Sequence, residues 1–301
     1  MSAELIHGKE VAEPILDEVT ERVLALREKG WTPRLASVQI GETPAAALYV
    51  RNQRKICEKV GIEFEEMHLS PHITQREAEA ALYALNMNPR ITGIILQRPI
   101  PHHLNLSKLQ LGIHPHKDVE GMNPANIGNA VYGNFSISPC TAVASVEALR
   151  SVHPHLRGTE AVVVGHSEIV GKPIALYLLK ELVTVSVCHH GTRHLAEHTR
   201  RADVLFVAVG KPGLVTADMV KQGAIVIDIG INQVEVKTAQ GETLRKTVGD
   251  VHFDTVKEIA GWITPVPGGI GPITRAILMR NTIACVDEQL RAYERHMLPG
   301  W

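Results

Sequence analysis

Apolar residues follow two different patterns along the first half of the chain. Apolar positions spaced four apart, as in Val11, Ile15, Val19 and Val23, predict amphipathic helices, whereas short apolar runs predict strands. The pattern predicts helices at residues 9–26, 45–60 and 76–88 and strands at residues 34–41, 64–69 and 91–97. Alternating strands and helices are typical of an α/β unit with a parallel sheet. Because residues 91–97 are almost wholly apolar, we expect the central strand there.

The second half repeats this alternation with more glycine. A helix is expected at residues 139–150, and apolar strands at residues 161–164, 184–188, 204–209 and 224–229, which is the doubly wound dinucleotide-binding pattern. Residues 234–248 predict a hairpin, residues 261–274 are too rich in proline and glycine for a helix or a regular strand, and residues 275–297 predict a long helix. We therefore predict two domains, residues 1–140 completed by helix 275–301, and residues 141–274.

Residues 161–173 predict a strand, a tight turn and a helix. Gly165 ends the strand, and Gly171 is small enough to lie close against it. Such a turn directs backbone N–H groups and a helix dipole at one point, where a phosphate can bind. The Gly-x5-Gly spacing differs from the common Gly-x-Gly-x-x-Gly, so an ordinary βα turn without a ligand stays open.

Two polar loops follow predicted strands of the first half. Gln97 ends one strand before a double-proline loop, and residues 116–124 bring Lys117, Asp118 and Glu120 together beside Gly121. Parallel sheets bind ligands at the carboxyl ends of their strands, so these loops are candidates for a binding site. The alternative is that each is a solvated connection.

Composition narrows the class of protein. Hydrophobic residues make up 45% of the chain, aromatic residues 4%, and the net charge is −1 with no basic block, so neither a nucleic-acid nor an acidic partner is expected. No apolar run approaches about 18 residues, and the first ten residues have no signal-peptide pattern. The four cysteines form no paired motif. We expect a globular cytoplasmic protein with no membrane partner.

Several of these segments, in this order, are shared with one known family. They are Tyr49 on the second helix and residues 97–101, 117–121, 139–141, 165–173, 228–232, 248–250 and 263–272. Together they resemble the bifunctional methylenetetrahydrofolate dehydrogenase/cyclohydrolase family. The resemblance implies an α/β folate-binding catalytic domain and a Rossmann-like NAD(P)-binding domain with a cleft between them, in a homodimer. It implies oxidation of 5,10-methylenetetrahydrofolate to the methenyl cation, which many members then hydrolyse to 10-formyltetrahydrofolate.

The resemblance also assigns roles residue by residue. It implies catalytic positions at Tyr49, Gln53, Gln97 and Glu120, and substrate contacts from Tyr49, Gln97, Glu120, Gly271 and Pro272. It implies cofactor contacts from Thr141, Gly165, His166, Ser167, Ile169, His190, Val209, Gly210, Ile231 and Thr274.

The second helix departs from the family pattern. The family carries Tyr-x-x-x-Lys, in which the tyrosine stacks on folate and the lysine takes part in proton transfer, whereas here Gln53 stands at the lysine position. Glutamine forms hydrogen bonds but does not titrate, and Lys55 is six residues from Tyr49, on a different face. Hydride transfer needs mainly positioning, whereas hydrolysis needs an acid–base group. We therefore expect the dehydrogenase activity to survive and the cyclohydrolase activity to be weak or lost.

Other departures leave alternatives open. Glu120 replaces an aspartate that holds the pterin, and its extra methylene leaves room for a different one-carbon pterin as substrate. Arg275 replaces a small apolar residue, and either contacts the glutamate tail of folate or faces solvent. A water held by Gln53 and Gln97 would preserve the full bifunctional activity. A non-catalytic folate- or nucleotide-binding regulator is the remaining alternative.

The sequence bears on the choice of cofactor at two positions. His166 replaces an arginine that can hold a 2′-phosphate, and His189-His190 follow the second strand of the cofactor domain where an acid would select NAD. The absence of that acid favours NADP, with His166 and His190 near the phosphate and a pH-dependent affinity; NAD is the alternative. His190, His194 and His198 lie four apart, but we expect no metal site.

Overall fold

The computed structural model describes residues 2–41, 44–237 and 243–297. The chain forms two compact units: unit 1 comprises Met1–Glu13 and Thr141–Thr274, and unit 2 comprises Pro14–Cys140 and Arg275–Trp301. The predicted first domain began at residue 1, whereas Met1–Glu13 belongs to unit 1, because β1 (Glu4–Leu5) pairs with β11 (Trp262–Ile263). No local pattern indicates this pairing, since each of these strands is only two residues long.

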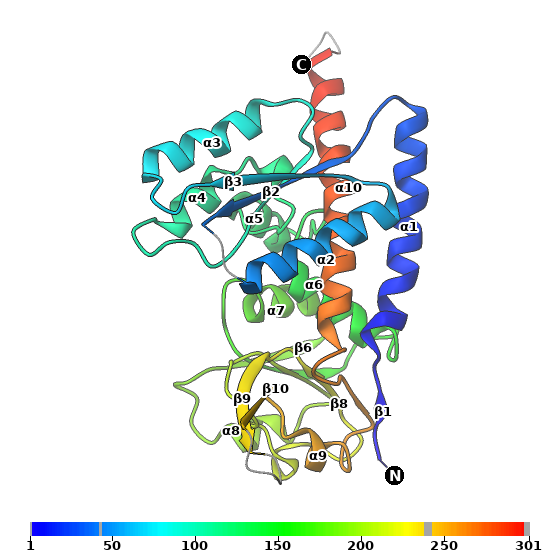
Figure 1. Cartoon of the computed structure of the whole chain (residues 1–301). Helices are drawn as coiled ribbons and strands as arrows, with labels where there is room; N and C mark the ends of the chain where they lie inside the picture. The colour runs from blue at the N-terminus through cyan, green and yellow to red at the C-terminus, as the bar shows by residue number, and fades with distance from the viewer. Residues whose placement is uncertain (1, 42–43, 238–242, 298–301) are drawn as a thin grey trace. The chain divides into compact units, whose positions relative to one another are not determined.

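Unit 1 contains a parallel six-stranded sheet in the order β1-β11-β8-β7-β5-β6, and Figure 1 labels its strands β1, β6 and β8. Its longer strands are β5 (Glu160–Val164), β6 (Thr184–Cys188), β7 (Val204–Val207) and β8 (Ile225–Asp228). The chain adds β6 on one side of β5 and β7 on the other, so the strand order reverses at β5. Such a reversal opens a crevice beyond the carboxyl ends of the strands, which is the binding position in doubly wound sheets.

Short helices and a hairpin complete unit 1. The helical segments are α6 (Cys140–Arg150), α7 (Gly171–Lys180), α8 (Leu195–Thr199), η2 (Ala217–Met219) and α9 (Phe253–Val256). Strands β9 (Asn232–Lys237) and β10 (Thr243–Val248) pair antiparallel, which confirms the predicted hairpin, although its turn lies outside the described residues. Apolar residues of β5, β7 and β8, with Val215, Val251 and Val256 from the following segments, form one buried cluster.

Unit 2 contains a parallel three-stranded sheet in the order β3-β2-β4 (Figure 1). The strands are β2 (Arg34–Ile40), β3 (Glu63–Leu69) and β4 (Gly93–Leu96). The prediction that the apolar strand at residues 91–97 is central was wrong, because β2 takes that place. β4 is apolar because both its faces are buried and because the loop at Asp118 covers its outer edge, where a bridge joins Ile94 to Asp118. The apolar character of a strand therefore shows that it is buried, but not whether another strand or a loop covers its edge.

The helical segments of unit 2 are α1 (Gly8–Glu28, whose first residues belong to unit 1), α2 (Pro44–Val60), α3 (Gln75–Met87), α4 (Leu106–Gly112), η1 (Pro115–Lys117), α5 (Pro124–Val131) and most of α10 (Ile270–Met297). Residues of α3 and α4 form a buried cluster with β2 and β4 that includes Leu82 and Leu109. On α2, the buried Cys57 lies 3.4 Å from Met279 of α10, sulfur to sulfur.

Helix α10 begins earlier than predicted. Residues 261–274 were expected to contain neither helix nor regular strand, but α10 starts at Ile270 and β11 occupies Trp262–Ile263. Pro272 is compatible with the first helical turn, because the N–H that proline lacks would have no partner within the helix there. The density of proline and glycine therefore predicts the loop at residues 264–269 correctly. The predicted end of this segment at residue 274 is wrong, because α10 begins at Ile270.

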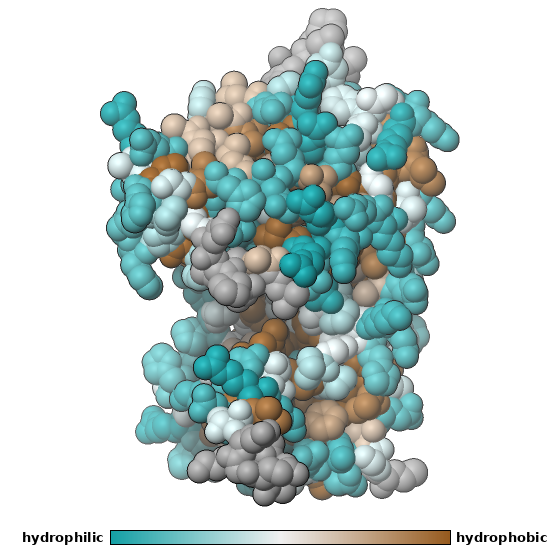
Figure 2. Space-filling model, viewed as in Figure 1, coloured by the Kyte–Doolittle hydropathy of each residue, from teal (hydrophilic) through white to brown (hydrophobic). Residues whose placement is uncertain are grey.

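Hydrophilic residues predominate on the face drawn in Figure 2, and hydrophobic ones occur there in small groups. Exposed apolar side chains in small numbers are normal on a protein surface. Among the residues that the structure describes, no helix combines the length and the apolar character needed to span a membrane.

We predict that Gly171→Ala destabilises unit 1. A methyl group on Gly171 would lie 2.0 Å from the carbonyl oxygen of Gly165, so α7 would have to move away from the end of β5. We expect a loss of about 2–3 kcal/mol in the free energy of unfolding, measured by urea titration.

Gly128→Ala serves as the matched control for this prediction. Gly128 also lies in a helix, but an added methyl group would meet no atom within 4 Å outside the neighbouring backbone, so the substitution should raise stability by about 0.5–1 kcal/mol. Equal unfolding curves for the two variants would show that the close approach at Gly165 is not a constraint.

Candidate functional site

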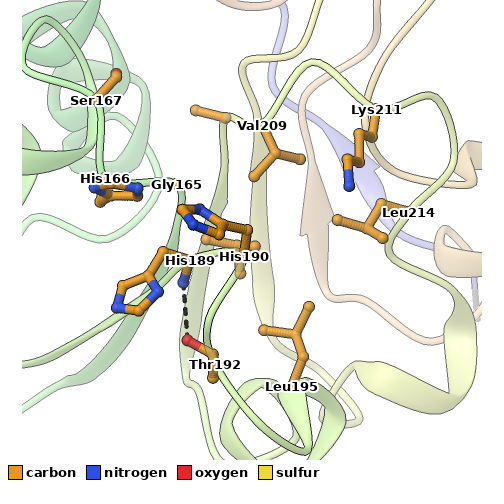
Figure 3. A pocket seen from close by; sticks show the side chains of 12 residues that line it. Gly165, His166, Ser167, His189, His190, Thr192, Leu195, Val209, Lys211 and Leu214 are labelled. Atoms are coloured by element: carbon orange, nitrogen blue, oxygen red, sulfur yellow. Dashed lines mark hydrogen bonds between the residues drawn. The ribbon is translucent and has the colours of Figure 1, made fainter.

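A pocket of about 390 Å³ lies at the carboxyl ends of β5, β6 and β7 in unit 1 (Figure 3). It is lined by Val164, Gly165, His166, Ser167, His189, His190, Thr192, Leu195, Ala208, Val209, Lys211 and Leu214. This position is the crevice at the strand-order reversal described above. The pocket therefore lies where a doubly wound sheet binds a nucleotide.

The turn between β5 and α7 is shaped for a close approach by a ligand. Gly165 has a φ of 126°, and a methyl group there would lie 2.2 Å from the carbonyl oxygen of Ala208, so only glycine fits. The Ser167 hydroxyl accepts a hydrogen bond from the backbone N–H of Val170, and no side chain caps the N-terminus of α7. A helix N-terminus of this kind attracts an anion such as a phosphate.

The pocket gathers some of the expected cofactor residues and not others. Gly165, His166, Ser167, His190 and Val209 line it, whereas Thr141, Ile169, Gly210, Ile231 and Thr274 do not. The Ile231 side chain is 71% exposed. His189, Thr192 and Lys211 also line the pocket and were not predicted as contacts, although the pair His189-His190 was visible in the sequence.

Two buried carboxylates fix the loops behind this pocket, and sequence reasoning missed both. Asp228 accepts hydrogen bonds from the backbone N–H groups of Gly230, Asp250 and Val251, at 3.0 Å each. Asp250 accepts in turn from the N–H groups of Val209 and Gly210, at 2.6 and 2.9 Å. Burial raises the pKa of Asp228 to about 6, and these N–H donors act in the opposite direction. The segment Asp228-Ile229-Gly230 and the Gly249-Asp250 pair were the available signals.

The candidate substrate site in unit 2 is built around two buried amides. Gln53 on α2 and Gln97 at the end of β4 are 0% and 3% exposed. The Nε2 of Gln97 donates to the Oε1 of Gln53 at 2.7 Å and to the hydroxyl of Ser37 at 2.9 Å. The Nε2 of Gln53 is buried and has no hydrogen-bond partner among the described residues. This arrangement leaves one N–H₂ donor available at the position where the family pattern has lysine.

No neighbouring cation of α2 takes that position. Lys55 is exposed, as expected from its spacing, and Arg54 is exposed and pairs with Glu66. The more distant Lys117 is 7% exposed, and its ammonium group donates to the carbonyl oxygens of Leu85, Asn86 and Asn88. Lys117 therefore anchors the loop that carries Asp118 and Glu120 to the C-terminal end of α3, where a cation is favoured.

Glu120 lies on this loop with its side chain 25% exposed. Its carboxylate is 3.8 Å from the Arg98 guanidinium and 3.4 Å from the amide nitrogen of Gln110. Burial raises the pKa of Glu120 to about 7, against the opposing effect of Arg98. A carboxyl group that titrates near neutrality is typical of a functional site.

Tyr49 joins these residues into one cluster. It lies one helical turn before Gln53, and its ring is 39% exposed. Burial raises the pKa of the Tyr49 phenol, with smaller upward effects from Cys140 and Glu120, while Gln53 and Arg275 lower it. The structure therefore brings together Tyr49, Gln53, Gln97 and Glu120, and it places Arg275 near the same ring. Gly271 and Pro272 lie in unit 1, in the first turn of α10.

The histidines spaced four apart do not share one helix face. His194 precedes α8 with a φ of 55°, His190 lies in the preceding turn, and only His198 is within the helix. Among the described residues, no group of three or more His, Cys, Asp or Glu side chains is arranged to hold a metal ion.

Two family models match the chain. The model of the tetrahydrofolate dehydrogenase/cyclohydrolase catalytic domain matches residues 6–120, and that of the NAD(P)-binding domain matches residues 139–290. The fold predicted from the sequence, an α/β catalytic domain and a Rossmann-like NAD(P)-binding domain, is thereby confirmed.

Relatives of known name match nearly the whole chain. "Bifunctional protein FolD 2" of Mesorhizobium japonicum is 54% identical, over 96% of this chain and 93% of that protein. "Bifunctional protein FolD 3" of Roseobacter denitrificans is 52% identical, over 99% and 98%.

Solved structures agree with these relatives. The bifunctional FolD enzyme of Campylobacter jejuni has a TM-score of 0.88 at 38% identity, over 96% of this chain and all of that one. The Trypanosoma brucei FolD enzyme, solved with NADP and an inhibitor, has a TM-score of 0.88 at 35% identity, over 97% and 99%. From its domains and its relatives, this chain belongs to the tetrahydrofolate dehydrogenase/cyclohydrolase family, with an NAD(P)-binding domain and a folate substrate.

Proposed function

We propose that this protein oxidises 5,10-methylenetetrahydrofolate to 5,10-methenyltetrahydrofolate with NAD(P)+ and hydrolyses that product weakly or not at all. The observation that carries the proposal is Gln53, which is fully buried and uncharged at the position of the family's lysine. In this proposal Tyr49 stacks on the pterin and Glu120 holds its amino group and ring N–H. Gln97, Gly271 and Pro272 complete the substrate contacts.

Hydride transfer makes few demands on proton chemistry. The nitrogen lone pair of the substrate expels the hydride to the nicotinamide and leaves an iminium cation. No proton is transferred in this step, so the reaction needs no general base. Positioning of the two reactants supplies most of the rate, and the cofactor supplies the hydride acceptor. The hydrogen-bonded chain from Ser37 through Gln97 to Gln53 is rigid enough for that task. Within the part of the chain that the structure describes, the Gln53 Nε2 has no hydrogen-bond partner, so we propose that it donates to substrate.

Hydrolysis makes a different demand. A water must lose a proton as it attacks the methenyl carbon, and a positioned acid–base group contributes about 10²–10⁴ in rate to such a step. The Gln53 amide cannot take up that proton. Lys55 is exposed, and the Lys117 ammonium is engaged by three carbonyl groups.

One observation favours a second candidate, the full bifunctional enzyme. Glu120 has a pKa raised to about 7 and influences the Tyr49 phenol, so it belongs to the same cluster and can accept a proton near neutral pH. The names of the relatives are consistent with this candidate as well. A different pterin substrate or a non-catalytic regulator has no comparable support.

We further propose that unit 1 holds the nucleotide, with Thr141, Ile169, Gly210, Ile231 and Thr274 extending the contacts of the pocket residues. We propose that the protein is a homodimer, as the resemblance implies. We also propose that it acts in the cytoplasm, which agrees with its four free cysteines. Sedimentation of the purified chain tests the dimer.

We predict that the wild-type protein accumulates methenyltetrahydrofolate in the presence of NADP+ or NAD+, and that the product decays at the spontaneous rate. Gln53→Lys should restore an ammonium group at the family position and raise the decay rate by at least about tenfold, because it restores an acid–base group. Absorbance of the methenyl product follows both steps in one assay.

Arg51→Lys is the control for this experiment, because it places a lysine on the exposed face of the same helix and should leave both rates unchanged. Rapid hydrolysis by the wild-type protein would overturn the proposed loss. If Glu120→Gln then slowed hydrolysis at saturating folate far more than it slowed hydride transfer, Glu120 would be the acid–base group of the second candidate.

We also predict that binding of the folate substrate strengthens as pH rises from 6 to 8. Only the ionised Glu120 can accept two pterin N–H groups, and a pKa of about 7 makes the ionised fraction increase through this range. At saturating cofactor, kcat/KM for the folate should increase by about tenfold. In Glu120→Gln it should be lower and flat.

Thermal unfolding supplies an independent check of the raised Glu120 pKa. Since the folded-state pKa exceeds the ordinary value of 4.5, the folded protein binds more protons than the unfolded chain between about pH 4.5 and 7, so stability falls as pH rises. Glu120→Gln should lose less stability over that interval than the wild type. An identical slope would show that Glu120 has an ordinary pKa.

A further inference from the structure

Arg98 and Glu120 form an open ion pair in unit 2. The Nη2 of Arg98 lies 3.8 Å from Oε2 of Glu120, which is beyond hydrogen-bonding distance. Elsewhere in the same unit, the Nη2 of Arg22 donates to both carboxylate oxygens of Asp287, at 2.8 and 3.0 Å. In contrast with that closed pair, the two charged groups of the open pair lie near each other but do not satisfy each other's hydrogen bonds.

The fold explains why these two side chains meet. Arg98 follows β4 by two residues, and a parallel bridge joins Ile94 of that strand to Asp118 of the neighbouring loop. The loop continues alongside the strand from this point, so Glu120 lies beside the end of β4. The Gln110 amide on α4 connects the two charges, because its oxygen accepts from Arg98 at 3.1 Å and its nitrogen donates to Glu120 at 3.4 Å.

The Arg98 guanidinium has unused hydrogen-bonding capacity. It carries five N–H donors, but in the described part of the chain the acceptors found for it, the Gln110 amide oxygen and the Met122 sulfur at 2.9 Å, both contact Nη2. A thioether sulfur is a weak acceptor. The Nε atom is buried and has no hydrogen-bond partner among the described residues. Because a buried donor without a partner costs free energy, this nitrogen marks a position where an oxygen of a ligand can bind.

The other charged groups of this loop do not compete for the open pair. The buried Asp118 carboxylate accepts hydrogen bonds from the backbone N–H of Asn123 at 2.6 Å and from the side-chain amide of Asn126 at 3.1 Å. The Lys117 ammonium group donates to three backbone carbonyl oxygens. The free donors of the guanidinium and the acceptor oxygens beside them are therefore available to a ligand.

The open pair presents donors beside acceptors, and this pattern matches one edge of the pterin ring. Along that edge a folate carries an oxygen on C4, an N–H at N3 and an amino group on C2. In the proposed function Glu120 accepts from the amino group and the ring N–H. We propose that the Arg98 guanidinium donates to the 4-oxo oxygen beside them, and that this contact selects 4-oxo pterins over their 4-amino analogues. This inference rests on the proposed function, in which unit 2 binds the folate.

The selection follows from the exchange of an acceptor for a donor. In a 4-amino analogue an amino group replaces the oxygen, so N–H donors would face N–H donors and the buried Nε would keep no partner. Sites that hydrogen-bond their ligand reject such analogues strongly, because buried polar groups are left unpaired. A hydrogen bond from a charged donor is stronger than one between neutral groups, so its loss should weaken binding by about 10- to 100-fold.

Calorimetric titration of the full chain with tetrahydrofolate and with its 4-amino analogue, tetrahydroaminopterin, tests the inference without turnover. At pH 8.0 Glu120 is mostly ionised, because its pKa is about 7. The wild type should bind tetrahydrofolate at least about 100-fold more tightly than the analogue. Arg98→Leu should weaken the binding of tetrahydrofolate by about 10- to 100-fold and change that of the analogue by less than about threefold.

Two further variants and a kinetic measurement separate recognition from a structural role. Arg98→Lys keeps the charge but not the planar fork of donors, so its preference should lie between those of the wild type and Arg98→Leu. Arg22→Leu removes the guanidinium of the closed pair and should bind both ligands as the wild type does. In the enzymatic assay Arg98→Leu should raise KM for methylenetetrahydrofolate by about 10- to 100-fold and leave kcat within about threefold, because the contact exists before and during hydride transfer.

The pH of the titration separates a direct contact from an effect on Glu120. Burial raises the pKa of Glu120 to about 7, and Arg98 acts in the opposite direction, so Arg98→Leu also raises this pKa. At pH 9.5 the carboxyl group is ionised to a larger extent in both proteins, so a direct contact predicts that the loss of tetrahydrofolate binding persists there. Recovery of binding at pH 9.5 would show that Arg98 acts through the charge of Glu120, and would overturn the inference.

The remaining outcomes distinguish this inference from the proposed function. Equal weakening of both ligands in Arg98→Leu, or equal affinity of the wild type for both, would overturn the selection by Arg98. Failure of the wild type to bind either ligand would overturn the folate site of unit 2 as well. Selective binding of tetrahydrofolate by a protein without dehydrogenase activity would support the inference and refute the proposed reaction.

Discussion

The pocket of unit 1 depends on two carboxylates buried behind it. Asp228 ends β8 and gathers three backbone N–H groups, one of which belongs to Asp250, and Asp250 then gathers the N–H groups that follow β7. One connected network of hydrogen bonds thus holds the loops that follow β7 and β8 and the segment that follows β10. Each charge is satisfied by several donors, which is the condition under which buried carboxylates are tolerated. The glycines beside them, Gly230 and Gly249, leave the space that these side chains fill.

Much of the fold could be predicted from the sequence, because burial and hydrogen bonding of each strand leave a local signal. The strands that became β5, β7 and β8 are apolar runs bounded by glycine or polar residues, and the first long helix shows apolar residues spaced four apart from Val11 to Val23. The order of strands in a sheet leaves no such signal. β4 is as apolar as a central strand because the Asp118 loop covers its edge. β1 is too short for any pattern and becomes a strand only through its partner β11.

The candidate site shows the same division. Gln53 and Glu120 could be identified because each replaces a residue of a recognisable motif. Gln97 could be identified too, but the other neighbours could not, because they come from distant segments. Ser37 accepts a hydrogen bond from Gln97, and Arg98 and Gln110 face Glu120. His189 adjoins the predicted contact His190 in the sequence. The Gly191 N–H that orients the His189 ring could not be predicted, because it depends on the conformation of the turn.

At Gln53 the chain has a neutral amide where the resemblance to the family implies an ammonium group. In unit 2 the exchange puts an amide at a fully buried position, where an ammonium group would lose its hydration. In the proposed function the charge that binds the pterin is Glu120, which ionises as pH rises. Burial thus has two effects in unit 2. It disfavours an ammonium group beside Gln97, and it delays the ionisation of Glu120 until pH approaches neutrality.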